Sequence, residues 1–126
     1  MAKRVITGPD VLSSSLPFSP LVEANGFVFL AGQVGDLPGT VGAVPGGIEA
    51  ETRQTLENVG RLLRAAGLTY EHVVQATVYL LDFADFAAMN AVYRQYFPAG
   101  PPTRATVGVS GLAADYRIEI VVVAAR

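Results

Sequence analysis

An arginine and a glutamate lie in two segments near the C-terminus that are rich in β-branched and apolar residues. Arg104 lies within the expected strand 103–109, and Glu119 lies within the expected strand 116–124. If these strands pair as a hairpin, Glu119 stands opposite Arg104 or Thr106, and Arg104 and Glu119 then share one face of the sheet. The guanidinium fork could hold a substrate carboxylate there, and the glutamate could orient or activate a water molecule beside it. A structural ion pair between the strands explains the same spacing, and the spacing alone favours that simpler interpretation.

The residues of several common catalytic centres are absent from the sequence. The chain has no cysteine, which excludes a disulfide framework, a thiolate metal site and a cysteine nucleophile. Its one histidine, His72, is expected to be an ordinary solvated residue, because a general base needs a positioned partner. Segment 108–112 resembles a nucleophile elbow but ends in Leu112, where that motif requires glycine. No phosphate-binding glycine motif and no metal-ligand spacing is present, so we expect a reaction without cofactor or metal.

One α+β domain spanning residues 1–126 is expected to hold these groups. The expected elements are strands 3–6, 21–24, 27–30, 72–81, 103–109 and 116–124, and helices 48–66 and 83–97. This order of elements predicts a mixed β-sheet with two helices packed on one face.

Local signals support the first hairpin, the first helix and the central strand. Asn25-Gly26 between two apolar runs predicts a hairpin, because both residues tolerate a positive φ. The first helix has an apolar stripe on one face, and its opposite face carries polar residues that include Glu51 and Asn58. The β-branched segment 72–81 predicts a strand buried on both faces.

The composition favours a self-associating cytoplasmic protein. Hydrophobic residues make up 51%, charged residues make up 16% and the net charge is −2, so we expect no nucleic-acid partner. The longest aliphatic run, 120–125, is too short to cross a membrane, and the first ten residues lack the apolar core of a secretory signal. A small domain with few charges leaves apolar surface exposed, which predicts an obligate homo-oligomer.

A series of short stretches follows an order that is typical of one known family. The stretches are Pro17-Phe18-Ser19-Pro20, Asn25-Gly26, FLAGQVG at 29–35, ETRQTLEN at 51–58, Asp82-Phe83 with Asn90-Ala91-Val92-Tyr93 and Tyr96-Phe97, PTRATV at 102–107, and Ile118-Glu119-Ile120. Together they cover nearly the whole chain, and they resemble the Rid (YjgF) family of reactive-intermediate deaminases, which includes RidA-like and endoribonuclease L-PSP-like proteins.

The resemblance implies a chorismate-mutase-like fold and a homotrimer with sites in clefts between neighbouring subunits. It also implies cofactor-independent hydrolysis of 2-imino acids, derived from 2-aminoacrylate or 2-aminocrotonate, to 2-keto acids and ammonia. Arg104 matches the family arginine that holds the substrate carboxylate, and Glu119 matches the acid that positions the attacking water. The substrate-binding positions that the resemblance implies are Phe18, Ala31, Gly32, Asn90 and Thr106.

Three of these positions depart from the family pattern. Phe18 replaces a usual tyrosine, Ala31 replaces a usual serine, and Thr106 replaces a frequent cysteine. Phe18 and Ala31 make the cleft more apolar, which favours a larger or more hydrophobic imino or enamino acid. Two alternatives stay open: a deaminase or hydrolase in a nitrogen-compound degradation pathway, and a non-enzymatic metabolite-binding or chaperone-like trimer. RNA cleavage, to which some family members are linked, is the activity that the net charge favours least.

Overall fold

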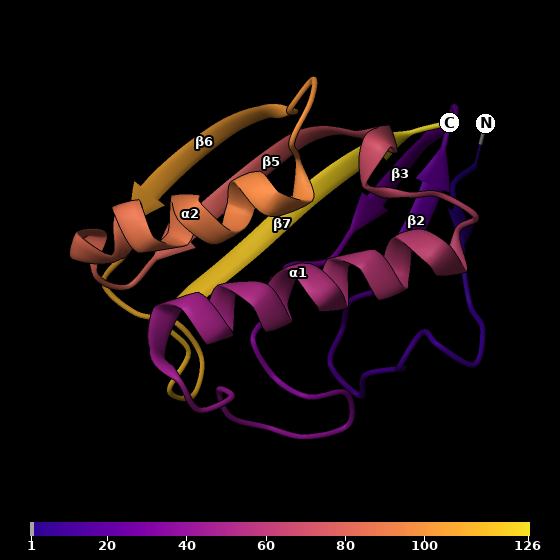
Figure 1. Cartoon of the computed structure of the whole chain (residues 1–126). Helices are drawn as coiled ribbons and strands as arrows, with labels where there is room; N and C mark the ends of the chain where they lie inside the picture. Colours follow the sequence, from indigo (N-terminus) through magenta and orange to yellow (C-terminus); the bar gives the residue numbers. More distant parts are fainter. Residues whose placement is uncertain (1) are drawn as a thin grey trace.

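A mixed β-sheet with two helices packed against it forms residues 2–126, the part of the chain that this computed structural model describes (Figure 1). The strands are β1 (Arg4–Val5), β2 (Leu21–Ala24), β3 (Phe27–Leu30), β4 (Gln33–Val34), β5 (Val73–Leu80), β6 (Thr103–Gly108) and β7 (Ile118–Ala125). The helices are α1 (Gly47–Ala65) and α2 (Phe86–Tyr96), and the 3₁₀ turns η1 (Tyr70–His72) and η2 (Phe83–Asp85) precede β5 and α2.

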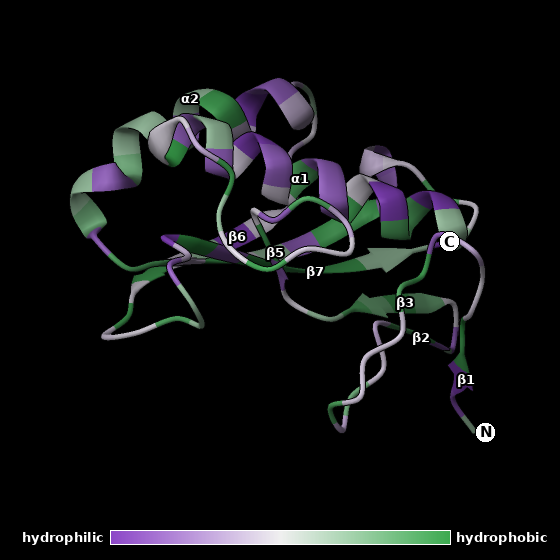
Figure 2. Cartoon of the chain, turned by 90° about the horizontal axis from the view of Figure 1, so that it is seen from below, coloured by the Kyte–Doolittle hydropathy of each residue, from purple (hydrophilic) through white to green (hydrophobic). Residues whose placement is uncertain are grey.

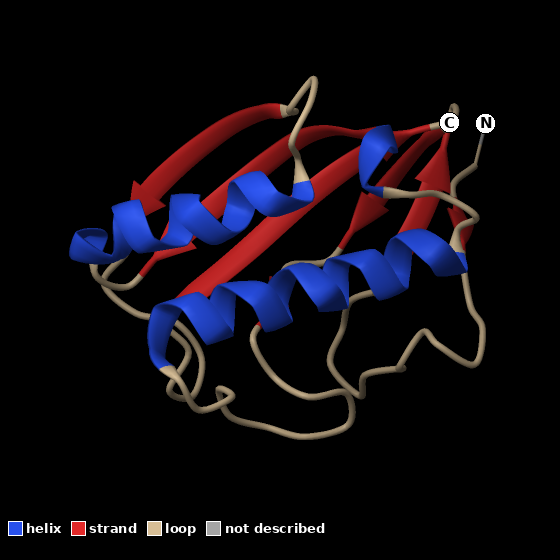
Figure 3. Cartoon of the chain, in the orientation of Figure 1, coloured by secondary structure: helices blue, strands red, loops and turns tan. Residues whose placement is uncertain are grey.

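The strands lie in the order β1-β2-β3-β7-β5-β6, and β4 also pairs with β7. β5 and β6 are parallel, whereas β7 runs antiparallel to β3, β4 and β5. Both helices lie on the same side of this sheet (Figures 2 and 3). The predicted α+β class, with a mixed sheet and two helices on one face, is therefore confirmed.

The predicted hairpin at Asn25-Gly26 joins β2 to β3. Leu21 pairs with Leu30, and the register continues to the turn without a bulge. Asn25 has a φ of 53° and Gly26 has a φ of 82°, which is the pair of positive values that a tight two-residue hairpin turn needs. The local sequence signal thus determines this part of the sheet.

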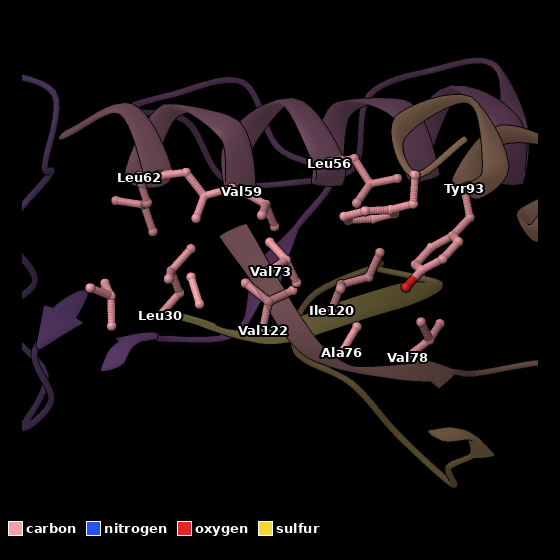
Figure 4. Packing of buried hydrophobic residues seen from close by; sticks show 14 of the residues in the cluster. Leu30, Leu56, Val59, Leu62, Val73, Ala76, Val78, Tyr93, Ile120 and Val122 are labelled. Carbon is pink, nitrogen blue, oxygen red and sulfur yellow. The ribbon is translucent and has the colours of Figure 1, made fainter. Parts of the chain in front are cut away.

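Helix α1 supplies most of the helical side of the core. It begins and ends one residue earlier than the predicted helix 48–66. Figure 4 shows Leu56 and Val59 pointing from α1 toward the side chains of Ile120 and Val122 on β7. All four side chains are at most 1% exposed, so the apolar stripe read from the sequence is the buried face.

Two residues predicted on the outer face of α1, Glu51 and Asn58, are instead buried, with exposed fractions of 2% and 1%. The Nδ2 of Asn58 donates hydrogen bonds to the backbone oxygens of Val34 and Asp36, each at 2.8 Å. Val34 is the last residue of the short strand β4, and Asp36 lies in the loop that follows it. The prediction was wrong because a buried polar side chain here satisfies backbone groups from a distant segment.

Replacing Asn58 by alanine is expected to lower the free energy of unfolding by about 1–3 kcal/mol, because two partly buried carbonyls lose their donor. Arg53→Ala on the exposed side of α1 is the matched control and should change stability by less than about 0.5 kcal/mol. Urea unfolding curves of the two variants and the wild type measure the difference. Equal losses in both variants would contradict the role given to Asn58.

The second face of the sheet, which we call the open face, carries no helix from residues 2–126 (Figure 2). On β5 only Val73, Ala76, Val78 and Leu80 are buried, so the prediction that this strand is buried on both faces is wrong for the single chain. The open face is nevertheless apolar. Its large side chains that are 40–45% exposed include Val5, Phe27, Phe29 and Val107.

Candidate functional site

Arg104 and Glu119 do not share a face of the sheet, contrary to the hairpin prediction. Strand β5 lies between β6 and β7. Ala76 is opposite both Arg104 and Val122, and it is buried beneath the helices, so Arg104 points to the helix side. Glu119 lies three positions from Val122 on β7 and therefore points to the open face. Within one chain, an ion pair between the two is ruled out by this topology.

The hairpin prediction is wrong because β6 and β7 are consecutive in the sequence but are not neighbours in the sheet. Strand β5, helix α2 and strand β6 instead form a strand–helix–strand unit, and its two strands pair in parallel. In such a crossover the helix packs over the sheet, and the chain then returns to form a second strand parallel to the first. Strand β7 then fills the position between β3 and β5.

Arg104 and Asn90 line one cavity of about 610 Å³, which we call the arginine cavity. It also borders Tyr93 and Arg94 of α2 and the proline-rich loop before β6. Among residues 2–126, Arg104 has neither an ion-pair partner nor a side-chain hydrogen bond. Its Cζ lies 4.7 Å from the ring centroid of Tyr93 and 5.7 Å from that of Phe86.

A second cavity of about 650 Å³, which we call the glutamate cavity, brings together Phe18, Ala31, Gly32 and Glu119. Most of its remaining lining is apolar and comes from β2, β3 and the loop before β7. The structure therefore groups the predicted site residues into two sets. Thr106 belongs to neither cavity; it is half-buried on β6 with its side chain on the helix side.

Gly32 brings the backbone directly against the Glu119 side chain. A Cβ added to Gly32 would overlap Glu119 Oε2, so only glycine fits without displacing the carboxylate. Strand β4 holds this segment in place, since Val34 pairs with Glu119. The Nε2 of Gln33 donates to the backbone oxygen of Ala31 at 3.0 Å, which further fixes the segment.

Burial raises the pKa of Glu119 above its ordinary value of 4.5. None of the ion pairs in residues 2–126 involves this carboxylate. A carboxylate with a raised pKa is a better proton acceptor than an ordinary surface glutamate. The group is therefore suited to take a proton from a water molecule.

Glu51, which the sequence placed on the outer face of α1, fixes the start of β7. Its Oε2 accepts hydrogen bonds from the backbone N–H of Arg117 at 2.5 Å and from that of Ile118 at 3.3 Å. Burial raises the pKa of Glu51, while the two backbone hydrogen bonds oppose the rise. Glu119 is the next residue along this strand, so Glu51 supports the backbone that carries it.

The structure gives His72 a local structural role. Its Nδ1 accepts a hydrogen bond from the backbone N–H of Thr69 at 3.1 Å and so closes the turn η1. Residues 2–126 contain no cluster of three or more histidine, aspartate or glutamate side chains that could hold a metal ion. In the same part of the chain, no helix combines the length and apolar character needed to cross a membrane.

Residues 9–126 match the family model described as Endoribonuclease L-PSP. The chain is 45% identical over 122 residues to a RutC family protein of Pyrococcus horikoshii, and the match covers 97% of each. It is 37% identical to the human protein named 2-iminobutanoate/2-iminopropanoate deaminase, covering 98% of this chain and 90% of the relative. It is 39% identical to Reactive Intermediate Deaminase A, chloroplastic, of Arabidopsis thaliana; the match covers 94% of this chain and 63% of that longer relative.

Solved structures with the same fold include a member of the conserved Rid protein family from Yersinia pestis. It superposes with a TM-score of 0.90 at 34% identity, over 99% of this chain and 100% of the other. A crystal structure of Escherichia coli TdcF with bound serine gives a TM-score of 0.88 at 34% identity, over 98% of each chain.

Proposed function

The chain belongs to the Endoribonuclease L-PSP family, which is the Rid (YjgF) family, and from this premise we propose that it hydrolyses reactive 2-imino or enamino acids to 2-keto acids and ammonia. In this reaction the oxygen of water adds to the imine carbon, the C–N bond breaks, and the nitrogen leaves as ammonia. No electrons are transferred to or from the substrate. The relatives named as deaminases support hydrolysis of this type of C–N bond in general.

The observation that carries the proposal is the guanidinium of Arg104, which faces the arginine cavity without an anionic partner among residues 2–126. A planar guanidinium offers two parallel N–H groups to a carboxylate, and every 2-imino acid carries one. Asn90 in the same cavity can donate to or accept from the substrate. Glu119 supplies the proton acceptor for the water.

We place each complete site between two copies of the chain. One copy holds Arg104 and Glu119 in separate cavities and on opposite faces of its sheet. The two side chains of one copy therefore cannot contact the same substrate molecule. The apolar open face supports association, because such a surface is unfavourable in water. A homotrimer of the chorismate-mutase-like type would bring the arginine cavity of one copy to the glutamate cavity of the next.

Turnover of 2-iminopropionate and 2-iminobutyrate, generated in the assay and followed by ammonia or keto-acid release, tests the function. The wild type is expected to accelerate hydrolysis. Arg104→Ala should lower kcat/KM by about 30- to 3,000-fold, the cost of leaving one member of a charged pair without its partner. Arg94→Ala, which removes the other arginine of the same cavity, is the matched control and should lose far less.

The proposal fails if the wild type does not accelerate hydrolysis, or if Arg104→Ala and Arg94→Ala behave alike. The same assay with an imine derived from leucine addresses the substrate side chain. Phe18 and Ala31 in the glutamate cavity favour a larger apolar group, so the leucine-derived imine should react at least as fast as 2-iminopropionate. A strong preference for the small imine would remove that part of the proposal.

A further inference from the structure

Arg104 is held by aromatic rings rather than by an acid. Its side chain leaves the edge strand β6 on the helix side and passes beneath α2. The Cζ atom lies 4.7 Å from the ring centroid of Tyr93 and 5.7 Å from that of Phe86. Both distances are within the range of about 6 Å over which a cation is attracted to the face of an aromatic ring.

The two rings are well placed to fix the guanidinium because other aromatic rings fix them. Phe86 and Tyr93 lie seven residues apart on α2 and so occupy one side of the helix. Phe86 stacks on Phe83 with centroids 5.1 Å apart, and Tyr93 packs on Phe97 with centroids 4.8 Å apart. Tyr93 is only 6% exposed, which leaves its ring little freedom to move.

A ring restrains a guanidinium without neutralising it. An acidic partner would occupy the N–H groups of Arg104 and compete with a substrate carboxylate, whereas a ring contacts the face of the cation and leaves its N–H donors free. Among residues 2–126, no acidic side chain lines the arginine cavity. The result is a cation that is oriented in advance and still able to bind an anion.

The hydroxyl of Tyr93 lies apart from the contact between its ring and Arg104. Figure 4 shows it pointing away from α2 toward the sheet, near Ile120 and Val78. It is buried and has no hydrogen-bond partner in the described part of the chain. Burial also raises the pKa of this hydroxyl, although Arg104 opposes the rise, so it stays neutral. Within residues 2–126, Tyr93 therefore contacts Arg104 through its ring, and no hydrogen bond joins its hydroxyl to the guanidinium.

We propose that Tyr93 and Phe86 are positioning residues that hold the Arg104 guanidinium ready for the substrate carboxylate, an inference that rests on the proposed function. They act through Arg104 and contribute to binding more than to the chemical step. A ring that only fills the core would not affect binding in this selective way.

The test compares Tyr93→Leu with Tyr93→Phe, which keeps the ring and removes only the hydroxyl. Titration with 2-ketobutyrate, a product of the proposed reaction, gives the Kd by calorimetry, and imine turnover gives KM and kcat. Tyr93→Leu is expected to raise Kd and KM by about 2- to 30-fold with a smaller change in kcat, whereas Tyr93→Phe should stay within about 2-fold of the wild type. Phe86→Leu, at a half-buried position, provides a second measurement if Tyr93→Leu does not fold.

Combining Tyr93→Leu with Arg104→Ala separates positioning from general packing. If Tyr93 acts through Arg104, its replacement should not weaken 2-ketobutyrate binding further once Arg104 is gone. The inference is overturned if Tyr93→Leu and Phe86→Leu both bind like the wild type, or if Tyr93→Phe is as damaging as Tyr93→Leu. It is also overturned if the effect of Tyr93→Leu persists without Arg104. The proposed function fails separately, through loss of wild-type turnover or retention of activity in Arg104→Ala.

Discussion

Replacing Glu119 by glutamine is expected to lower kcat for imine hydrolysis by about 10²- to 10⁴-fold, the usual contribution of a positioned general base. KM should change little, because the substrate carboxylate binds Arg104 in the other cavity. Glutamine keeps the size of the side chain beside Gly32 and removes only its ability to accept the proton of water. Steady-state turnover of both proteins on the same imine measures the effect.

The pH dependence of kcat gives an independent readout of the same residue. Burial raises the pKa of Glu119 above 4.5, and only the ionised carboxylate can accept a proton. The kcat of the wild type should therefore rise with pH through this raised pKa, and Glu119→Gln should lack that rise. A variant that keeps wild-type kcat, or the same rise with pH, would contradict the role of Glu119.

Glu119→Gln is expected to lower activity without lowering the stability of the fold. A carboxyl whose pKa is raised by folding binds its proton more firmly in the folded state, so its contribution to stability is present below the unfolded pKa and falls as pH rises through the folded pKa. Glutamine does not ionise, so the variant does not lose this contribution to stability as the pH rises. Glu119→Gln should thus be at least as stable as the wild type at pH 7, which separates lost chemistry from lost folding in thermal unfolding curves.

The parts of the fold that sequence reasoning predicted depend on short-range signals. Asn25-Gly26 fixes a turn through its own backbone angles, and the stripe of α1 follows from residues three and four apart. The two helices and the strand between them were found for the same reason. Each of these signals lies within a segment of fewer than about twenty residues.

Strand order and the burial of polar side chains depend on segments that are distant in the sequence. The position of β7 between β3 and β5 is set by packing across the whole sheet, so the spacing of Arg104 and Glu119 could not show it. The order strand, helix, strand in 72–109 was the available signal for a parallel pair. Glu51 and Asn58 gave no such signal, because a helical pattern assigns polar residues to water.

The resemblance supplied the candidate site residues, but the way they group in space required coordinates. The resemblance identified Arg104, Asn90, Glu119 and Gly32 one at a time. It did not show that, within one chain, Arg104 and Asn90 line one cavity whereas Glu119 and Gly32 line another. The rings beside Arg104 were also missed, since an aromatic residue on the inner face of a helix is usually core.

Mixing two inactive variants is expected to restore activity. Arg104→Ala lacks the carboxylate-binding group, and Glu119→Gln lacks the proton acceptor. If each site takes Arg104 from one copy and Glu119 from its neighbour, a hybrid oligomer contains some sites with both groups intact. In an equal mixture, about half of the sites receive an intact Arg104 from one copy, and about half receive an intact Glu119 from the neighbouring copy. About a quarter of the sites therefore have both groups and should be active.

Activity should return only when the two variants exchange subunits. Each variant alone, unfolded and refolded in the same way, should remain inactive, and the two folded variants should gain activity only as they exchange copies. A hybrid oligomer detected by native mass spectrometry without restored turnover would place the whole site in one copy. That result would require Arg104 or Glu119 to leave its cavity, because β5 separates their strands and their side chains leave opposite faces of the sheet. Restoration near a quarter of the wild-type rate would instead assign the two halves of the reaction to two neighbouring copies.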